Sequence, residues 1–255
     1  MFEHMKSFHP RPLLTAMAMS ACLAPALAPT AAQAGMTGNI GVHSMYLLRG
    51  IGEENDGAAV QGGLDYSHDS GFYAGWWASN LGYSYDDSVV DTGGSGFEND
   101  LYAGFAGSAG DFTYKAGVIQ YYYIDVDDSN LTELLGNVGY GPVSFQMQYL
   151  LNNGWWGNSG DIYWTLNYTT PLPKDFTFAA SLGWYTYDDD DNSELCVACT
   201  TEDSAYRHLN LTLTHPIANT GANMYIQYTN AGEDRTGNDD YDDQVVFGLT
   251  YGFDI

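Results

Sequence analysis

Basic side chains are scarce in this sequence, and their scarcity excludes one large class of function. The 255 residues contain 7 Lys and Arg against 32 Asp and Glu, which gives a formal net charge of −25. A protein that binds nucleic acid needs a stripe or patch of positive charge to hold phosphates. Because a surface this acidic repels the phosphate backbone, the sequence predicts no nucleic-acid partner.

Cysteine is rare as well. Beyond Cys22, the chain has only Cys196 and Cys199, spaced Cys-x-x-Cys in an acidic stretch. No second Cys or His pair stands nearby to complete a zinc site, and no βαβ pattern surrounds the pair as in a redox motif. Export to an oxidising compartment favours a disulfide between Cys196 and Cys199. We predict no metal site and no cofactor.

Long apolar runs are also missing, so a membrane could be crossed only by strands. At the N-terminus, Lys6 and Arg11 precede an apolar run at 13–27, and Ala32-Gln33-Ala34 offers a small-x-small cleavage site. The run is shorter than a spanning helix requires. We therefore expect a cleaved signal peptide over residues 1–34 rather than an N-terminal anchor, followed by one domain over residues 35–255.

Glycine and tyrosine are abundant, with 30 Gly and 21 Tyr, which suits strands and turns better than helices. Apolar residues recur at every second position, as in Val143, Phe145, Met147 and Tyr149, which is the period of a strand with two different faces. This pattern predicts twelve strands, at 38–49, 59–68, 71–81, 98–109, 112–123, 132–141, 143–152, 161–170, 176–187, 205–215, 222–230 and 243–255.

The connections between these strands alternate in length. Short turns such as Gly141-Pro142 alternate with long acidic or Gly-rich stretches such as 82–97 and 188–204. Outer-membrane barrels have short periplasmic turns and long outer loops. The sequence therefore predicts an all-β fold, a single antiparallel transmembrane β-barrel of about 12 strands. We expect it in the outer membrane of a Gram-negative bacterium, with outer-membrane lipids as partners.

A soluble β-sandwich is the alternative, because it also alternates and can also be exported. A sandwich should expose polar residues, whereas here the less hydrophobic strand face consists of Gly, Ser, Thr, Asn, Gln and Tyr. Aromatic residues at strand ends are typical of the two membrane interfaces. The six tryptophans that we assign to such girdles are Trp76, Trp77, Trp155, Trp156, Trp164 and Trp184. These features favour the barrel.

Four motifs in the first hundred residues carry a family resemblance. They are Ser44-x-Tyr46-x-x-Arg49-Gly50, Gln61-Gly62-Gly63-x-Asp65, Gly71-Phe72-Tyr73-Ala74-Gly75-x-Trp77-x-Ser79-Asn80 and Glu98-x-Asp100-x-Tyr102-x-Gly104. In order and spacing they resemble the N-terminal signature of the TorF-type porins, exported bacterial proteins of largely unassigned function. The resemblance implies a barrel with a pore role. The end of the chain, Gly248-x-x-Tyr251-x-Phe253, resembles the signal read by the barrel-assembly machinery.

Strand parity selects the residues that should face the lumen. A charged side chain facing lipid costs about 2–4 kcal/mol for Arg at the bilayer midplane, so polar groups should meet inside. The candidates are Arg49, Gln61, Asp65, Trp77, Ser79, Glu98, Asp100 and Tyr102. They could form a polar constriction in which Arg49 opposes the carboxylates. They could equally form a structural ion pair that plugs the barrel.

These features predict a pore for passive diffusion of small polar, cationic solutes. The alternative is a non-conducting barrel that serves as a surface scaffold, an adhesion protein or a ligand-binding protein. Acidic runs in the long loops could bind divalent cations weakly. We predict no catalytic residues, since His208 near Asp203 and Ser204 is the arrangement nearest to a rim hydrolase and lone histidines are commonly structural.

Overall fold

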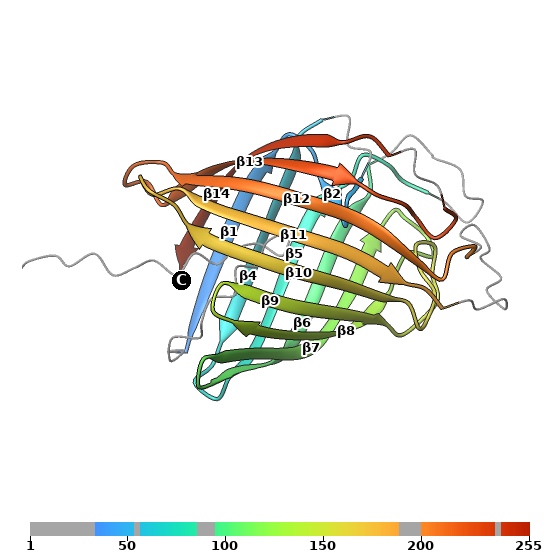
Figure 1. The fold of residues 1–255 in the computed structure, drawn as a ribbon, viewed down its shortest axis with the longest axis horizontal. Coiled ribbons are helices and arrows are strands. Elements are labelled where there is room, and N and C mark those ends of the chain that lie inside the picture. The colour runs from blue at the N-terminus through green and yellow to red at the C-terminus, as the bar shows by residue number, and fades with distance from the viewer. Residues whose placement is uncertain (1–33, 54–56, 86–94, 189–199, 238–240) are drawn as a thin grey trace, which may run out of the picture.

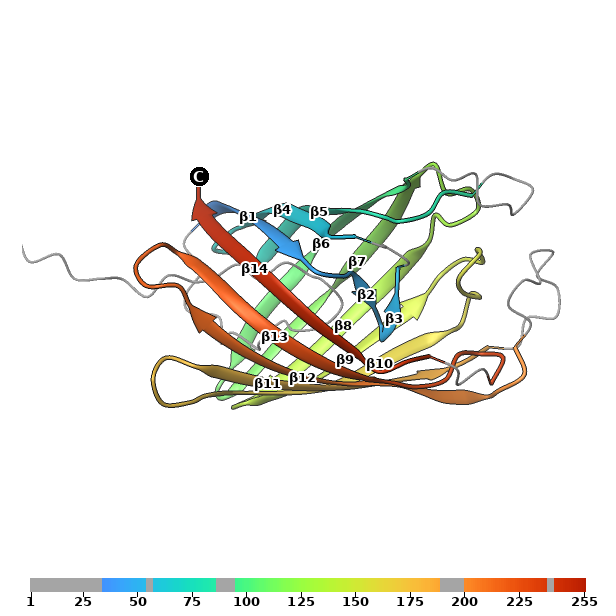
Figure 2. The ribbon, with the colours of Figure 1, turned by 90° about the horizontal axis from the view of Figure 1, so that it is seen from above.

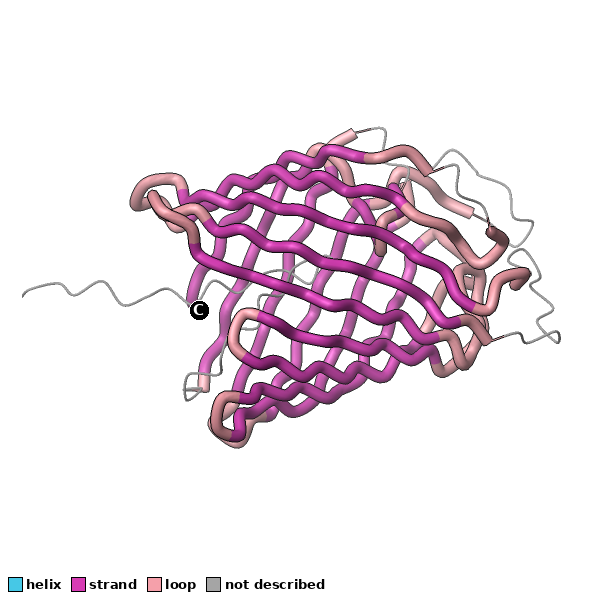
Figure 3. Tube along the Cα trace, viewed as in Figure 1, coloured by secondary structure: helices cyan, strands magenta, loops and turns pink. Residues whose placement is uncertain are grey.

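The computed structural model describes residues 34–53, 57–85, 95–188, 200–237 and 241–255. Residues 1–33 of the predicted signal peptide and the Cys196–Cys199 pair lie outside these residues. Within the described part of the chain, the regular elements are all strands, and twelve of them close into one antiparallel barrel (Figures 1 and 3). No helix in that part is long and apolar enough to cross a membrane.

The predicted fold class is confirmed, and the strand bounds differ from the prediction by a few residues. In chain order the barrel strands are β1 (Gly35–His43), β4 (Ala59–Ser67), β5 (Phe72–Asn80), β6 (Phe97–Ala109), β7 (Phe112–Ile124), β8 (Thr132–Tyr140), β9 (Val143–Leu150), β10 (Ile162–Pro171), β11 (Thr177–Thr186), β12 (Ser204–Pro216), β13 (Ala222–Ala231) and β14 (Gln244–Asp254). Strand β1 pairs with β4 on one side and with β14 on the other, so the sheet has no free edge.

Alternation along each strand sets which side chains face outward. In β14, Val245, Phe247 and Leu249 are about half exposed on the outer surface, while Val246 between them is buried inside. The same period holds round the barrel, and it gives an apolar outer surface around a polar and aromatic lumen. This distribution is what lipid outside and water inside require.

The two ends of the barrel differ in the length of their connections. Short turns join β4 to β5, β6 to β7, β8 to β9, β10 to β11 and β12 to β13, and we call this the short-turn end. The six longer connections meet at the opposite end, which we call the long-loop end, at the right of Figure 1. The C-terminus lies at the short-turn end. The predicted alternation of short and long connections is therefore confirmed.

The first predicted strand, 38–49, is wrong at its C-terminal end. Strand β1 stops at His43, and residues 45–53 turn into the barrel as a small hairpin of β2 (Leu47–Leu48) and β3 (Ile51–Gly52) (Figure 2). The backbone N–H of Ser44 donates to Phe247 O at 2.8 Å and its hydroxyl accepts from Phe247 N at 3.0 Å, which ties the departing chain to β14. We call residues 45–53 the inward hairpin.

The turn of the inward hairpin has positive φ at both central residues, 51° at Arg49 and 87° at Gly50. A two-residue hairpin turn with both φ angles positive matches the twist of its strands, and it normally uses Asn-Gly. Arginine is poorly suited to that backbone, and such a residue persists only where its surroundings hold it. Side-chain contacts of Arg49 stabilise this backbone conformation.

The tryptophan girdles predicted from sequence are only partly right. Trp76 is 37% exposed on the outer surface, and Trp164 and Trp184 stack there with ring centroids 6.4 Å apart. Trp77, in contrast, is buried in the lumen, and Trp155 and Trp156 line a cavity at the long-loop end. The bulky rings inside the barrel fill space that strand pattern alone would leave to water.

Candidate functional site

The inward hairpin places Arg49 against the far side of the lumen. Its guanidinium Nη2 lies 2.6 Å from Glu133 Oε2 of β8, and the two side chains are nearly inaccessible to solvent. The same guanidinium donates to the hydroxyls of Tyr121 in β7 and Tyr185 in β11. One side chain therefore joins three strands that are distant from the hairpin in sequence.

Further donors complete the surroundings of Glu133. Its Oε2 also accepts from the Tyr121 hydroxyl at 2.8 Å and from the Gln148 amide at 2.9 Å. A buried ion pair is stable only when its remaining polar atoms are hydrogen-bonded. The Arg49 charge also lies 4.5 Å from the centre of the Tyr163 ring, a cation–π arrangement. Glu133 was not among the lumen residues predicted from the sequence.

A second buried group lies beside the hairpin on β5 and β6. Tyr46 packs its ring 5.7 Å from Trp77, and the hydroxyls of Tyr46 and Tyr123 hydrogen-bond Glu98. Glu98 Oε2 and Asp100 Oδ1 are buried, and neither has a hydrogen-bond partner. Glu98 and Asp100 thus place two carboxyl groups side by side, and their side chains interact with each other.

Asp65 lies nearer the short-turn end and belongs to another cluster. The Tyr102 hydroxyl donates to its carboxylate at 2.6 Å, and the Lys115 ammonium lies 4.3 Å from the centre of the Tyr73 ring. Lys115 also acts electrostatically on Asp65. The cation that neighbours Asp65 is thus Lys115 rather than Arg49.

Gln61 and Ser79 form a short link across β4 and β5, with the Gln61 amide 3.3 Å from the Ser79 hydroxyl. Of the eight predicted lumen residues, seven are buried and Asp65 is half-buried. The structure groups Arg49 with Glu133, the pair Glu98 and Asp100 beside it, and Asp65 separately with Tyr102. The alternation along each strand predicts that these residues face inward, but it does not predict which of them contact one another.

Across the lumen, the strand segments 162–171, 177–186, 208–216 and 222–231 contain no Asp, Glu, Lys or Arg. Hydrogen bonds between neutral side chains run along them, from Thr212 to Gln227 at 3.1 Å and from Gln227 to Thr229 at 3.0 Å. We call this surface the neutral wall. The lumen side of β4–β8, with Asp65, Glu98, Asp100, Glu133 and Lys115, is the acidic wall.

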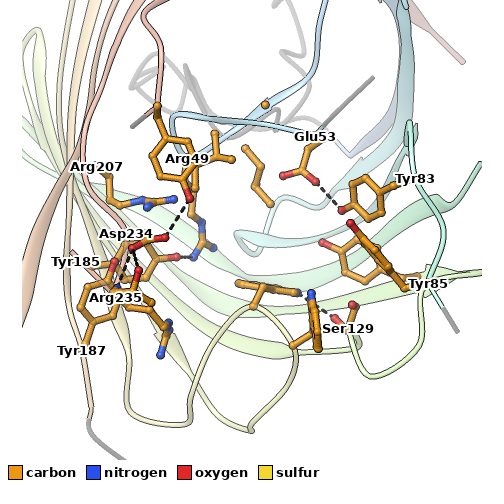
Figure 4. Close-up of a pocket in the computed structure, with 18 residues that line it drawn as sticks. Arg49, Glu53, Tyr83, Tyr85, Ser129, Tyr185, Tyr187, Arg207, Asp234 and Arg235 are labelled. Atoms are coloured by element: carbon orange, nitrogen blue, oxygen red, sulfur yellow. Dashed lines mark hydrogen bonds between the residues drawn. The ribbon is translucent and has the colours of Figure 1, made fainter. Parts of the chain in front are cut away.

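Above the inward hairpin, at the long-loop end, is a cavity of about 330 Å³ (Figure 4). Eight of the 18 residues that line it are aromatic. Tyr83 donates to Glu53 at 2.6 Å on one side, and burial together with the Glu53 charge raises the pKa of the Tyr83 hydroxyl well above its usual value. Tyr83 therefore stays protonated and keeps Glu53 in place.

Three arginines, Arg49, Arg207 and Arg235, also line this cavity. They are all the arginines that follow residue 34. Arg235 pairs with Asp161, and its guanidinium lies 4.9 Å from the centre of the Tyr187 ring. Arg207 and Arg235 were not predicted as site residues from the sequence, although three arginines in a chain this acidic are a signal of such a site.

A β-bulge explains the position of Arg207. Gly183 pairs with His208 and Trp184 pairs with Tyr206, so Arg207 has no partner in β11. Both Arg207 and His208 are consequently buried on the lumen side, which strict alternation forbids. Bulges commonly redirect a side chain in this way. In the sequence, the apolar residues Leu209, Leu211 and Leu213 occupy odd-numbered positions, whereas Tyr206 occupies an even-numbered one. The alternation of outward-facing residues therefore shifts by one position between them.

His208, the histidine considered for catalysis, does not have the surroundings expected of a catalytic histidine at the rim of a barrel. His208 is fully buried, and its Nε2 lies 2.6 Å from the Tyr163 hydroxyl. Asp203 and Ser204 are exposed. A catalytic histidine must reach the hydroxyl that it activates, and the hydroxyl that His208 reaches belongs to a buried tyrosine.

The fold and lumen together define a closed antiparallel β-barrel with an apolar outside and a polar and aromatic inside. Residues 28–253 match a family described as "Bacterial protein of unknown function (Gcw_chp)", and the chain belongs to that family. No curated protein matches the chain in sequence. The TorF-type resemblance stays a prediction.

Solved structures share the fold at low sequence identity. The chain is similar to the KdgM porin, with 11% identity, a TM-score of 0.52, and coverage of 85% of this chain and 99% of that one. A second similar chain, solved under the description "Unveiling the Mechanism Behind the in-meso Crystallization of Membrane Proteins", has 12% identity and a TM-score of 0.52, with coverage of 88% and 84%. At such identities the likeness concerns the fold.

Proposed function

We propose that the protein is a narrow outer-membrane pore through which small polar solutes diffuse. The proposal includes export by the signal peptide, assembly through the C-terminal strand, and an orientation with the long-loop end outside. The apolar outer surface and the edgeless sheet support a membrane position. A barrel of twelve strands is wider than the eight-stranded barrels that side chains fill.

The contrast between the two lumen walls is the observation that carries the proposal. The neutral wall presents hydroxyl and amide groups such as Thr212, Gln227 and Thr229, which can replace the hydration of a polar solute. The inward hairpin crosses the lumen and narrows it, with Arg49 held by Glu133 of the acidic wall and by Tyr185 of the neutral wall. The solute path in this proposal passes beside the hairpin, which also contacts Tyr185 and His208 at the long-loop end of the neutral wall.

Preference for cations is the second part of the proposal. Glu98 and Asp100 lie beside the hairpin with buried oxygens that accept no hydrogen bond. Arg49 is balanced by Glu133, so a proton lost from Glu98 or Asp100 leaves an excess negative charge at this constriction. A ring of carboxylates in a narrow passage favours cations over anions. Acidic residues in the long loops would add to this preference and could hold divalent cations weakly.

Single-channel recording in planar lipid bilayers tests the proposal. The purified protein should give discrete conductance steps, and a salt gradient should give a reversal potential of the sign expected for cations. Asp100→Asn should reduce that potential, while Asp175→Asn, in a short turn away from the constriction, should leave it unchanged. Anion-selective steps would contradict the cation preference.

Burial of the inward hairpin favours a second candidate, a non-conducting barrel that binds a ligand at its long-loop end. Tyr46, Leu47 and Arg49 are each at most 5% exposed, which is as buried as a protein core. If the hairpin closes the lumen, bilayers containing the protein stay silent. Silence for the wild type together with steps for a chain lacking the hairpin would establish this candidate over the pore.

A further inference from the structure

We propose that the cavity at the long-loop end is a binding site for a small carboxylate carried on a six-membered ring, with Arg207 as the group that binds the carboxylate. This site lies above the constriction proposed in the conduction pathway and shares Arg49 with it. Ligand binding at this site does not depend on whether the barrel conducts. The cavity volume, about 330 Å³, is at the lower end of the range of small-molecule sites.

Arg207 is the cavity arginine whose charge is not neutralised by an ion pair among the residues that the structure describes. Arg49 is paired with Glu133, and Arg235 is paired with Asp161. Arg207 makes no ion pair with any residue that the structure describes, and its Nη1 donates to a backbone carbonyl, Glu233 O, at 2.8 Å. Its Nε is buried without a hydrogen-bond partner, and the side chain is only 7% exposed.

A buried guanidinium with an unused N–H is costly unless something accepts from it. A carboxylate matches the guanidinium fork and can accept two parallel hydrogen bonds. The bulge in β12 is what brings Arg207 to the cavity, because regular pairing with β11 would turn it to the outer surface. The β-bulge and the buried Nε donor without a partner are therefore both found at Arg207.

The aromatic lining indicates that the carboxylate is attached to a flat or ring-shaped body. Tyr185 and Tyr187 stack almost parallel, with ring centroids 5.0 Å apart and planes at 10°, next to Arg207, whose charge lies 5.7 Å from the Tyr185 ring. Trp155 and Trp156 line the same cavity. Such rings pack against the faces of sugar rings and of aromatic rings alike.

Two carboxylates also line the cavity, and both have donors. Glu53 accepts from Tyr83, and Asp234 accepts from Tyr241 and from Thr236. They lie on the cavity wall as acceptors for hydroxyl or amine groups of a ligand. They would repel a ligand that carries several negative charges. The site therefore suits a ligand with one carboxylate on a larger neutral body.

Tryptophan fluorescence of the purified full-length protein in detergent tests the proposal, because Trp155 and Trp156 report on the cavity. Sodium glucuronate and sodium benzoate are titrated at constant ionic strength, with glucose as the uncharged control. At least one of the two carboxylates should bind saturably, and glucose should bind more weakly. Tighter binding of glucuronate would assign a sugar acid, tighter binding of benzoate an aromatic acid, and equal binding the shared chemistry.

Arg207→Gln should weaken that binding by about tenfold or more, while Lys174→Gln, in a short turn at the opposite end, should leave it unchanged. Arg207→Lys keeps the charge but loses the fork, so it should bind several-fold more weakly than wild type even if the glutamine variant does not fold. The proposal is overturned if neither carboxylate binds, if glucose binds as tightly, or if the folded Arg207 variants bind like wild type.

Discussion

The acidic wall and the neutral wall enclose the same lumen, but different forces stabilise them. On the acidic wall, Glu133 and Glu98 are buried against the inward hairpin and depend on Arg49, Tyr121 and Tyr123 for their hydrogen bonds. On the neutral wall, hydroxyl and amide groups satisfy one another within and between neighbouring strands. Loss of one partner should therefore cost far more on the acidic wall.

The largest expected effect is at the ion pair. Glu133→Gln leaves the Arg49 charge buried without its carboxylate, and breaking a buried pair from one side costs about 3–5 kcal/mol. Urea unfolding of the protein in lipid vesicles, followed by tryptophan fluorescence, measures the loss. A cost below about 1 kcal/mol would mean that Arg49 finds other acceptors and that the pair does not hold the hairpin.

The next effect is on the outer face of the neutral wall. Leu182 lies in the middle of β11 and is 38% exposed on the surface assigned to lipid. Leu182→Arg should cost about 2–4 kcal/mol in vesicles, whereas Leu172→Arg, in a short turn, should cost about 0–1 kcal/mol. The same unfolding experiment compares them. Equal costs would argue against lipid around the middle of this wall.

A glycine at the tip of the hairpin gives the third test. A Cβ added at Gly50 would lie 2.7 Å from Arg207 O and 2.7 Å from His208 Cβ, whereas a Cβ at Gly110 would meet nothing. Both residues have positive φ, so Gly110→Ala controls for backbone strain, which costs of order 1–3 kcal/mol. Gly50→Ala should be the more destabilising in the unfolding experiment. Equal effects would place the hairpin tip away from β12.

The smallest effect is expected inside the neutral wall. Thr212→Val removes one hydroxyl from the link to Gln227, and a neutral hydrogen bond contributes about 1 kcal/mol. Unfolding in vesicles should show a change of that size. A loss as large as that of Glu133→Gln would erase the difference between the two walls.

Much of the barrel follows from the sequence because one simple repeat governs it. Period two and the alternation of short and long connections set the strands, the closure and the inward positions of Glu98, Asp100 and Tyr102. The inward hairpin could not be predicted in this way. Residues 45–53 continue the apolar character of β1, and their direction depends on Glu133, which lies 84 residues from Arg49 in sequence.

The bulge at Arg207 was missed for a related reason. One extra residue between paired positions reverses the parity of everything before it, and a pattern search that assumes regular pairing assigns such a residue to the wrong face. The cavity is lined by residues from this bulge, from the long connections and from the inward hairpin. Its residues come from segments distant in sequence, so only the folded chain brings them together.

The central claim is that the inward hairpin lies inside a closed barrel and narrows its lumen. The most direct measurement is single-channel conductance of the wild type and of a variant in which residues 45–53 are replaced by a Gly-Ser segment of equal length. Conductance of the variant should rise clearly, and the variant should still migrate as a folded barrel on an unheated gel. An unchanged conductance in a correctly folded variant would contradict it.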